Sequence, residues 1–312
     1  MRHRRLGRSG LRVSRLALGT MTWGRAVDEE GARDQLRAFV EAGGTLVDTA
    51  HGYAGGRAET ILGGLVGEVV PRDEVVLCTK SGVVRRGDAR VVDTSRGGLL
   101  RQLDASLGRL GTAHVDLWLV HSWSDEVPLE ETIGALETAV SSGRTRYVGV
   151  SNFSGWQSAR ALSLLEQMRI PLVANEIQYS LVHRDPEFEL VGAGLALGFG
   201  LLPWSPLGRG VLTGKYRHGI PSDSRATSRD FPGFAERFLD AHSRSVVEAV
   251  DTAAKGLQVS PTEVALSWVR DRPGVTAPIV GARTVAQLRT ALASEDLDLP
   301  REIAVALDEV SA

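Results

Sequence analysis

The clearest strand pattern in the chain reads Val115-Asp116-Leu117-Trp118-Leu119-Val120, with apolar side chains at five of its six positions. Seven further runs are comparably short and apolar, at residues 16–18, 45–47, 75–78, 147–150, 174–177, 200–204 and 277–280. Such runs are too short for helices, and consecutive apolar positions are typical of parallel strands that are covered on both faces. The sequence therefore predicts eight parallel strands.

Longer amphipathic stretches separate these runs, at residues 28–42, 94–110, 130–142, 156–168, 185–197, 245–257 and 284–293. The first begins at Asp28, a favourable N-cap, and places Ala32, Leu36 and Phe39 on one face. Strands that alternate with helices in this way predict an α/β protein, and eight of them predict a (β/α)8 TIM barrel. A doubly wound sheet shows the same alternation and is the structural alternative.

The remaining segments complete the predicted architecture. Leu6-Gly7-Arg8-Ser9-Gly10-Leu11-Arg12-Val13 has a Ser-Gly turn between two short runs, which predicts an N-terminal β-hairpin at the floor of the barrel. No Pro-rich or Ser-rich linker divides the chain, so residues 1–312 are expected to form a single barrel domain. Residues 217–243 are polar and predict a long loop at the C-terminal face of the barrel.

Composition excludes several classes of protein. Of 312 residues, 43% are hydrophobic and 24% are charged, as in ordinary globular proteins, and 36 basic residues nearly balance 38 acidic ones. This balance gives no reason to expect nucleic acid or a membrane surface as a partner. Cys78 is the only cysteine, which excludes a disulfide scaffold and favours the reducing cytoplasm. We expect neither a transmembrane helix nor a secretory signal, and nothing in the sequence predicts the oligomeric state.

Several catalytic motifs are missing. The seven histidines form no His-x-His or His-Glu-x-x-His pattern, so no metal site is predicted. Gly149-Val150-Ser151-Asn152-Phe153 lacks the final glycine of a nucleophile elbow. The glycines at 192, 194 and 198 are spaced one residue too widely for a dinucleotide fingerprint, and no tyrosine is followed four residues later by lysine. These absences leave no evidence for a Rossmann fold.

A set of polar residues follows three successive predicted strands. Asp48, Lys80 and His121 lie at the strand ends, and Tyr53 lies in the loop after Asp48. In a barrel, these ends meet at one mouth, where chemistry takes place. A lysine beside a tyrosine lowers the tyrosine pKa, and an aspartate can fix the lysine. We therefore expect Tyr53 to act as an acid, Lys80 and Asp48 to tune it, and His121 to orient a carbonyl oxygen.

These residues stand within motifs that resemble the aldo-keto reductase superfamily over nearly the whole chain. The matching motifs, in the family's order and spacing, are Val47-Asp48-Thr49-Ala50-His51-Gly52-Tyr53, Cys78-Thr79-Lys80, 115–121, 149–152, Trp204-Ser205-Pro206-Leu207-Gly208-Arg209-Gly210, Leu212-Thr213-Gly214-Lys215-Tyr216 and Gly281-Ala282-Arg283-Thr284. The resemblance implies a (β/α)8 barrel, an Asp-Tyr-Lys-His tetrad formed by Asp48, Tyr53, Lys80 and His121, and NAD(P)H bound without a Rossmann domain. It is closest in motif to bacterial members and to potassium-channel β subunits.

The same resemblance implies a set of cofactor-binding residues. It assigns the nicotinamide carboxamide to Ser151, Asn152 and Gln178, and a stacking ring to Trp204. It assigns the pyrophosphate and the adenosine end to Ser205, Leu207, Gly208, Gly210, Lys215, Gly281, Arg283, Thr284 and Gln287. An arginine where a helix begins suits a 2′-phosphate, so NADPH is preferred to NADH, which remains possible. Ala291 departs from the pattern, because many members carry a polar residue there.

The expected reaction is therefore the NADPH-dependent reduction of a small aldehyde or ketone to an alcohol. Trp23 and Trp123 are expected either to line the substrate pocket or to pack at the top of the barrel. A regulatory subunit that binds nicotinamide nucleotide with little turnover is the alternative function. Arg217, Arg225, Arg229, Arg237 and Arg244 raise a nucleotide-linked keto sugar as an alternative substrate, against the interpretation that they are solvated surface residues.

Overall fold

Eight parallel strands form the centre of the molecule. The computed structural model describes residues 1–312 except 88, 218 and 222–235. The strands are hydrogen-bonded in the order β11 (Gly200–Trp204), β10 (Leu172–Gln178), β9 (Thr145–Ser151), β8 (Val115–Val120), β5 (Val76–Ser81), β4 (Leu46–Asp48), β3 (Ala17–Gly19) and β12 (Ile279–Val280). Leu201 on β11 pairs with Val275, just before β12, which brings the first strand of this order against the last.

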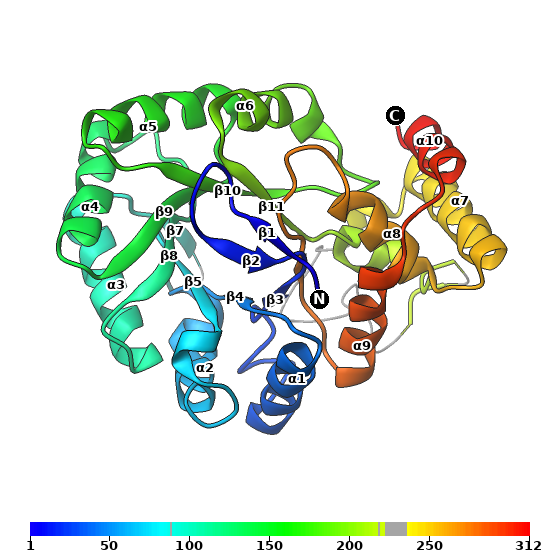
Figure 1. Cartoon of the computed structure of the whole chain (residues 1–312), viewed down its shortest axis with the longest axis horizontal. Helices are drawn as coiled ribbons and strands as arrows, with labels where there is room; N and C mark the ends of the chain where they lie inside the picture. The colour runs from blue at the N-terminus through cyan, green and yellow to red at the C-terminus, as the bar shows by residue number, and fades with distance from the viewer. Residues whose placement is uncertain (88, 218, 222–235) are drawn as a thin grey trace.

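Helices surround the strands (Figure 1). They are α1 (Glu29–Glu41), α2 (Arg57–Leu65), α3 (Arg96–Leu110), α4 (Leu129–Ser141), α5 (Gly155–Gln167), α6 (Leu190–Leu197), α7 (Ala241–Leu257), α8 (Pro261–Arg270), α9 (Val285–Ala293) and α10 (Arg301–Val310). Because each barrel strand pairs with the next one along the chain, the topology is a (β/α)8 barrel, as predicted, and not a doubly wound sheet. Asp28 caps α1 by accepting a hydrogen bond from the Gly31 N–H, also as predicted.

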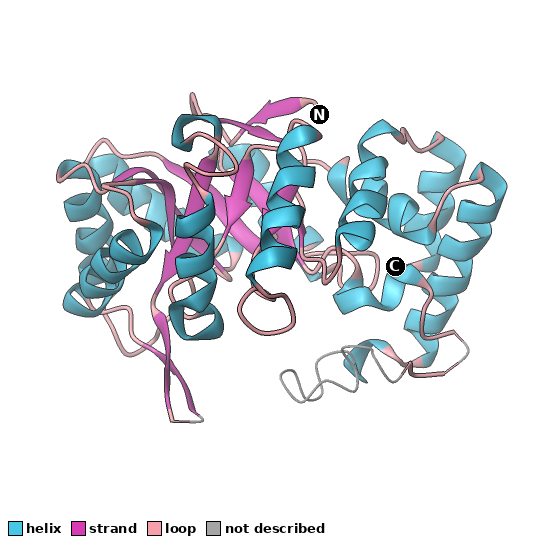
Figure 2. Cartoon of the chain, turned by 90° about the horizontal axis from the view of Figure 1, so that it is seen from below, coloured by secondary structure: helices cyan, strands magenta, loops and turns pink. Residues whose placement is uncertain are grey.

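Two hairpins stand at opposite ends of the barrel (Figure 2). The predicted N-terminal hairpin pairs β1 (His3–Arg5) with β2 (Arg12–Ser14). Its Leu6 and Val13 are fully buried and pack with strand residues such as Leu46 and Leu117, so the hairpin closes the barrel floor. The second hairpin, β6 (Val83–Arg86) with β7 (Ala89–Val92), follows β5 on the side where the strands end.

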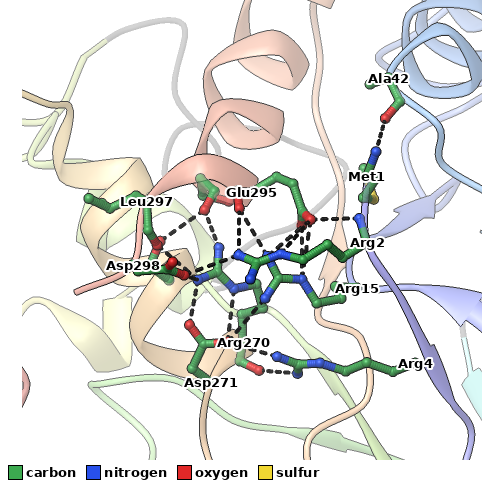
Figure 3. Close-up of polar contacts among 12 residues, drawn as sticks. Met1, Arg2, Arg4, Arg15, Ala42, Arg270, Asp271, Glu295, Leu297 and Asp298 are labelled. Atoms are coloured by element: carbon green, nitrogen blue, oxygen red, sulfur yellow. Dashed lines mark hydrogen bonds and ion pairs between the residues drawn. The ribbon is translucent and has the colours of Figure 1, made fainter.

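An ionic network fastens the N-terminal segment to the C-terminal third of the chain (Figure 3). Arg15 binds both carboxylate oxygens of Glu295 at 3.2 Å through Nε, and the Arg2 backbone N–H donates to Glu295 at 2.7 Å. The guanidinium of Arg4 donates to the Arg270 carbonyl at 2.6 Å and to Asp271 at 2.8 Å. These bonds therefore connect the N-terminal and C-terminal parts of the chain in addition to the hydrogen bonds between barrel strands.

The structure also contains elements that the sequence patterns did not predict. The helices α2, α8 and α10 and the β6–β7 hairpin were not expected, and residues 185–197 form a 3-10 turn, η3 (Asp185–Glu187), and then α6. Part of the predicted loop at 217–243 lies outside the described residues, and its end forms η6 (Glu236–Phe238) and the start of α7. In the part of the chain that the structure describes, no helix combines the length and apolar character of a membrane span.

Candidate active site

The predicted tetrad comes together at the carboxyl ends of the strands. Asp48 is the last residue of β4, Lys80 lies near the end of β5, and His121 directly follows β8. Tyr53 begins the 3-10 helix η1 (Tyr53–Gly56). Asp48, Tyr53 and His121 line one cavity of about 820 Å³. Lys80 is fully buried beside them, with Nζ 5.5 Å from the centre of the Tyr53 ring.

Lys80 bonds to two carboxylates. Its Nζ donates to Asp48 Oδ1 and, at 2.8 Å, to Glu176 Oε2 on β10. The Asp48 contact was expected from the sequence, whereas Glu176 was not singled out because its run, Ala174-Asn175-Glu176-Ile177, counted only as a strand. A charged residue inside a fully buried strand was the available signal, since unpaired buried carboxylates are rare. The thiol of Cys78 lies within 4.8 Å of the carboxylates of Asp48 and Glu176, to which Lys80 is bonded.

The electrostatics of this group are strongly coupled. Burial alone would lower the pKa of Lys80, but Asp48 and Glu176 raise it well above its ordinary value, so the ammonium form is held. Burial and the neighbouring Asp48 charge raise the pKa of Glu176 to about 8, against the opposing effect of Lys80. Near neutral pH, Glu176 is therefore largely protonated, and it loses its proton in mildly alkaline solution.

Tyr53 differs from the expectation in its acidity. The sequence argument was that Lys80 lowers the tyrosine pKa, and Lys80 does act in that direction. Burial is the larger effect, however, and with Asp48 and Glu176 it raises the pKa of Tyr53 above its ordinary value. Lys80 therefore lowers the pKa of Tyr53 as expected, but burial outweighs this effect, so the net pKa of Tyr53 in the protein alone is raised. Tyr53 holds its proton until a reacting group accepts it.

His121 is neutral over the physiological pH range. Burial, with smaller effects from Lys80 and Arg90, lowers the pKa of His121 to about 3. Its ring meets the Tyr53 ring edge-on, with centroids 6.0 Å apart. The buried Nδ1 of His121 has no hydrogen-bond partner among the described residues. A neutral imidazole beside a tyrosine hydroxyl is a suitable donor to a carbonyl oxygen.

The cavity continues from the tetrad along a second group of predicted residues. Those that line it are Ser151, Asn152, Trp204, Ser205, Leu207, Gly210, Lys215, Gly281, Arg283 and Gln287. The indole N–H of Trp204 donates to Asn152 at 3.0 Å, and the Asn152 amide donates to the His121 carbonyl at 2.9 Å. These contacts join the tetrad to the loop after β11.

The lining fits the nicotinamide dinucleotide that the resemblance implies. In the loop after β11, Ser205, Arg209 and Gly210 adopt left-handed backbone conformations, which bend the loop around the cavity. A Cβ at Gly210 would come within 3.1 Å of Lys215 Nζ, so a positive charge stands close to open backbone. The N-terminal end of α9 borders the same cavity through Arg283, which precedes the N-cap Thr284, and through Gln287 in the first turn. Ammonium, guanidinium and a helix N-terminus are the partners that phosphates require.

Three predicted cofactor residues do not line this cavity. Gln178, at the end of β10, is buried, and its Oε1 accepts a hydrogen bond from Arg237 while Nε2 has no partner among the described residues. Gly208 is buried in the turn, where a Cβ would meet Val182 at 2.5 Å. Thr284 caps α9 by accepting from the Gln287 N–H. Gly208 and Thr284 therefore support the shape of the lining. On β10, Glu176 lines the cavity, whereas Gln178 does not.

The two tryptophans expected near the substrate do not reach the cavity. Trp23 is fully buried in the core, and its indole N–H donates to Gln35 at 2.9 Å. Trp123 packs edge-on against Phe153 and Trp156 at a separate small depression. Barrel-top packing, the alternative interpretation, describes both residues, because their neighbours on the surrounding loops and helices cover them.

Of the arginines near residues 217–243, Arg217 is bound to Glu248 and Asp251 on α7, at 2.6 and 2.7 Å. Arg237 contacts Gln178, whereas Arg225 and Arg229 lie outside the described residues. A different arginine, Arg90 on β7, lines the cavity and contributes to the low pKa of His121. The structure thus provides a positive charge near the tetrad that sequence reasoning missed.

Comparison with known proteins agrees with this geometry. The aldo/keto reductase family model matches residues 15–312. The oxidoreductase YrpG of Bacillus subtilis is 34% identical over 320 residues, covering 99% of this chain and 96% of that protein. L-glyceraldehyde 3-phosphate reductase of Escherichia coli K12 is 33% identical, covering 92% and 86%. A rice protein named as a probable voltage-gated potassium channel subunit beta is 35% identical, covering 92% and 89%.

The family match spans the barrel, the tetrad and the cavity lining, and the relatives align over nearly their whole lengths. The chain belongs to the aldo/keto reductase family of enzymes.

Proposed function

We propose that this enzyme reduces a small aldehyde or ketone to an alcohol with NADPH, in the cytoplasm, and that Tyr53 supplies the proton. The observation that carries the proposal is the convergence of Asp48, Tyr53 and His121 on one cavity, with Lys80 bound to Asp48 behind them. The buried, unpaired thiol of Cys78 favours the compartment.

Tyr53 is the proton donor in this proposal. The Tyr53 O–H bond breaks as a new O–H bond forms on the substrate oxygen, which leaves a phenolate. Lys80 is held as an ammonium near the ring and stabilises that phenolate. Asp48 bonds to Lys80 and fixes the position of Nζ. General acid catalysis by a positioned side chain contributes about 10²–10⁴-fold to such reactions.

His121 orients the carbonyl group. Because the low pKa keeps the ring neutral, one ring nitrogen carries a hydrogen that can be donated to the substrate oxygen. The Asn152 amide holds the backbone at His121. The carbonyl oxygen would then lie between the Tyr53 hydroxyl and the imidazole, where charge develops during reduction.

The cofactor, when bound, supplies the hydride that reduces the carbonyl carbon. Ser151, Asn152 and Trp204 would hold its nicotinamide end, and Gly210, Lys215 and Arg283 would hold the phosphates. The preference for NADPH over NADH rests on Arg283 at the start of α9, where a guanidinium and helix N–H groups favour a further phosphate.

Arg90 indicates the class of carbonyl compound. Its guanidinium lines the cavity and influences His121, and among the described residues it makes no ion pair. An anionic group on the substrate would pair with it. The relative named L-glyceraldehyde 3-phosphate reductase makes phosphorylated aldehydes the first compounds to test.

The test is a measurement of NADPH and NADH oxidation by the purified protein with a panel of aldehydes and ketones, both neutral and anionic. We expect turnover with NADPH and a higher kcat/KM for anionic aldehydes. The panel includes a nucleotide-linked keto sugar, the alternative substrate raised by the arginines. Tight binding of NADPH without turnover of any carbonyl compound would support the alternative function, a nucleotide-binding regulatory subunit, for which the potassium-channel relative is the supporting observation.

A further inference from the structure

We propose that Glu176 is a positioning residue whose proton, acting through Lys80, controls how readily Tyr53 gives up its own proton during reduction. The inference rests on the proposed function, because it concerns the acid of that reaction. It adds to the tetrad a fifth residue, which shares Lys80 with Asp48 and belongs to none of the motifs that the sequence shows.

The position of Glu176 is fixed on all sides. Its carboxylate bonds to Lys80 at 2.8 Å, its side chain is almost fully buried, and it lines the cavity that contains Tyr53. Its backbone carbonyl accepts hydrogen bonds from the Ser151 hydroxyl at 3.0 Å and from the Asn152 N–H at 2.9 Å. The backbone of Glu176 is therefore held by residues at the end of β9, and its side chain cannot turn away without losing the bond to Lys80 on β5.

The titratable groups that face Glu176 come from three segments. Asp48 is on β4, Lys80 and Cys78 are on β5, and Tyr53 begins η1. The strands that flank β10 present neutral side chains, Ser151 on β9 and Leu202 on β11. Lys80 is thus the cation that two carboxylates share among the described residues.

This sharing decides the cost of forming the Tyr53 phenolate. With Lys80 charged, Asp48 ionised and Glu176 protonated, the group is neutral, and the phenolate adds the first net negative charge. With Glu176 also ionised, the group is already negative, and the phenolate adds a second charge in a buried site. The charge on Glu176 raises the pKa of Tyr53, which agrees with this direction. The protonated form of Glu176 is therefore the form that favours proton donation.

A pH dependence follows with a definite sign. As the pH rises through the pKa of Glu176, about 8, the carboxyl ionises and reduction slows. If the ionised form is inactive, kcat/KM for reduction falls by about tenfold between pH 7 and pH 9. Glutamine at this position keeps the size and the carbonyl oxygen of the side chain but has no proton to lose, so the fall should disappear.

The experiment compares wild type with Glu176→Gln over pH 6 to 10, at saturating NADPH and with one aldehyde that the wild type reduces. The matched control is Glu59→Gln, which removes another fully buried carboxylate, one that is paired with Arg109 at 2.7 Å and does not line the cavity. We expect kcat/KM of Glu176→Gln to change by less than about twofold between pH 7 and pH 9. At pH 9, kcat/KM of this variant should exceed that of the wild type. For Glu59→Gln, the pH at which kcat/KM has fallen by half should be the same as in the wild type.

The outcomes separate this inference from the proposed function. A wild type that turns over no carbonyl compound contradicts the proposed function. A wild type that turns over, with Glu176→Gln showing the same fall at the same midpoint, overturns the role of Glu176 alone. A shift of the midpoint in Glu59→Gln as well would overturn it too, because any lost buried charge would then act alike.

A second measurement needs no substitution at Glu176. In wild-type protein with ¹³C-labelled glutamate and bound NADPH, one side-chain carboxyl resonance should titrate with the midpoint found for kcat/KM. If all glutamate resonances titrate near their ordinary range, about pH 4 to 5, the inference is wrong. This result decides the matter even if Glu176→Gln does not fold.

Discussion

Single residues in the cavity owe their chemistry to burial as much as to their neighbours. Burial lowers the pKa of His121 to about 3 and raises that of Glu176 to about 8. Both shifts favour the uncharged form, which is the form that costs least to bury. Lys80 is the exception, because two carboxylates outweigh its burial and hold its charge. Near neutral pH, the cavity is therefore lined by a neutral imidazole and a protonated tyrosine, with a fixed ammonium buried behind them.

The low pKa of His121 predicts a loss of stability in mild acid. In the unfolded chain the imidazole takes up a proton below about pH 6.5, whereas in the folded protein it does not until about pH 3, so acid favours unfolding. Between pH 7 and pH 5, His121 should reduce the free energy of unfolding by about 2 kcal/mol. Urea unfolding of wild type and His121→Gln at both pH values measures this difference. Equal losses in the two proteins would contradict a buried neutral His121.

The sequence patterns identified the functional residues that lie at the ends of predicted strands. Asp48, Lys80 and His121 each follow an apolar run, so their convergence could be predicted. Glu176 could not be found in this way, because its role depends on the Lys80 contact across the barrel, between strands that are far apart in the chain. The raised pKa of Tyr53 likewise depends on its burial in the folded protein and then on the charges around Lys80, which no local pattern in the sequence records.

Among the elements, the β6–β7 hairpin shapes the substrate end of the cavity. A Cβ at Gly52 would come within 3.1 Å of the Val83 carbonyl, so the hairpin packs against the segment that leads to Tyr53. Arg90 on β7 reaches the cavity. The hairpin was missed because Arg85, Arg86 and Arg90 interrupt its apolar residues, whereas the barrel strands read as nearly continuous apolar runs. The helix α2 was missed for a related reason, since Gly63 and Gly64 weaken its helical pattern.

This hairpin predicts a charge-dependent specificity. Arg90→Ala should lower kcat/KM for glyceraldehyde 3-phosphate by about tenfold or more, because a charge-assisted hydrogen bond is worth about 1.5–3 kcal/mol. For neutral glyceraldehyde the change should be less than about twofold. Arg101→Ala, an exposed change on α3 away from the cavity, is the control. Equal losses for the two substrates would show that Arg90 acts on the fold or on His121 and not on a substrate anion.

The whole molecule depends on closure at its floor as well as on the strand ladder. The network around Glu295 ties the segment before β3 to the segment after α9. Burial alone would raise the pKa of Glu295, but hydrogen bonds from Arg15 and from the Arg2 backbone lower it. The eight-strand alternation predicted the barrel, but this closure joins residues about 280 positions apart and leaves no trace in local patterns.

Loss of this network should destabilise the protein in a pH-dependent way. Glu295→Gln should reduce the free energy of unfolding at pH 7 by about 3 kcal/mol, because it removes the shorter of the two ion pairs of the buried Arg15 and leaves only the 3.8 Å contact with Asp271. A carboxyl with a lowered pKa stabilises the folded state above its unfolded pKa and loses this effect as the pH falls through the folded value. The difference in free energy of unfolding between the wild type and Glu295→Gln should therefore be smaller in acid. Urea unfolding at pH 7 and at pH 3.5 measures this difference.

A matched control removes an exposed member of the same network. Asp298→Asn breaks the contact of Asp298 with Arg2 at the surface and should cost less than about 1 kcal/mol. If the difference in free energy of unfolding between the wild type and Glu295→Gln stays constant with pH, then lost packing, and not the ion pair with Arg15, causes the destabilisation.

The most direct test of the account is the effect of Tyr53→Phe on reduction. The variant keeps the ring that packs beside His121 and Lys80 and removes only the hydroxyl. With an aldehyde that the wild type reduces, we predict that kcat falls by at least about 100-fold while the Kd for NADPH stays within about twofold. Reduction by Tyr53→Phe at a rate near that of the wild type would contradict the assignment of Tyr53 as the proton donor.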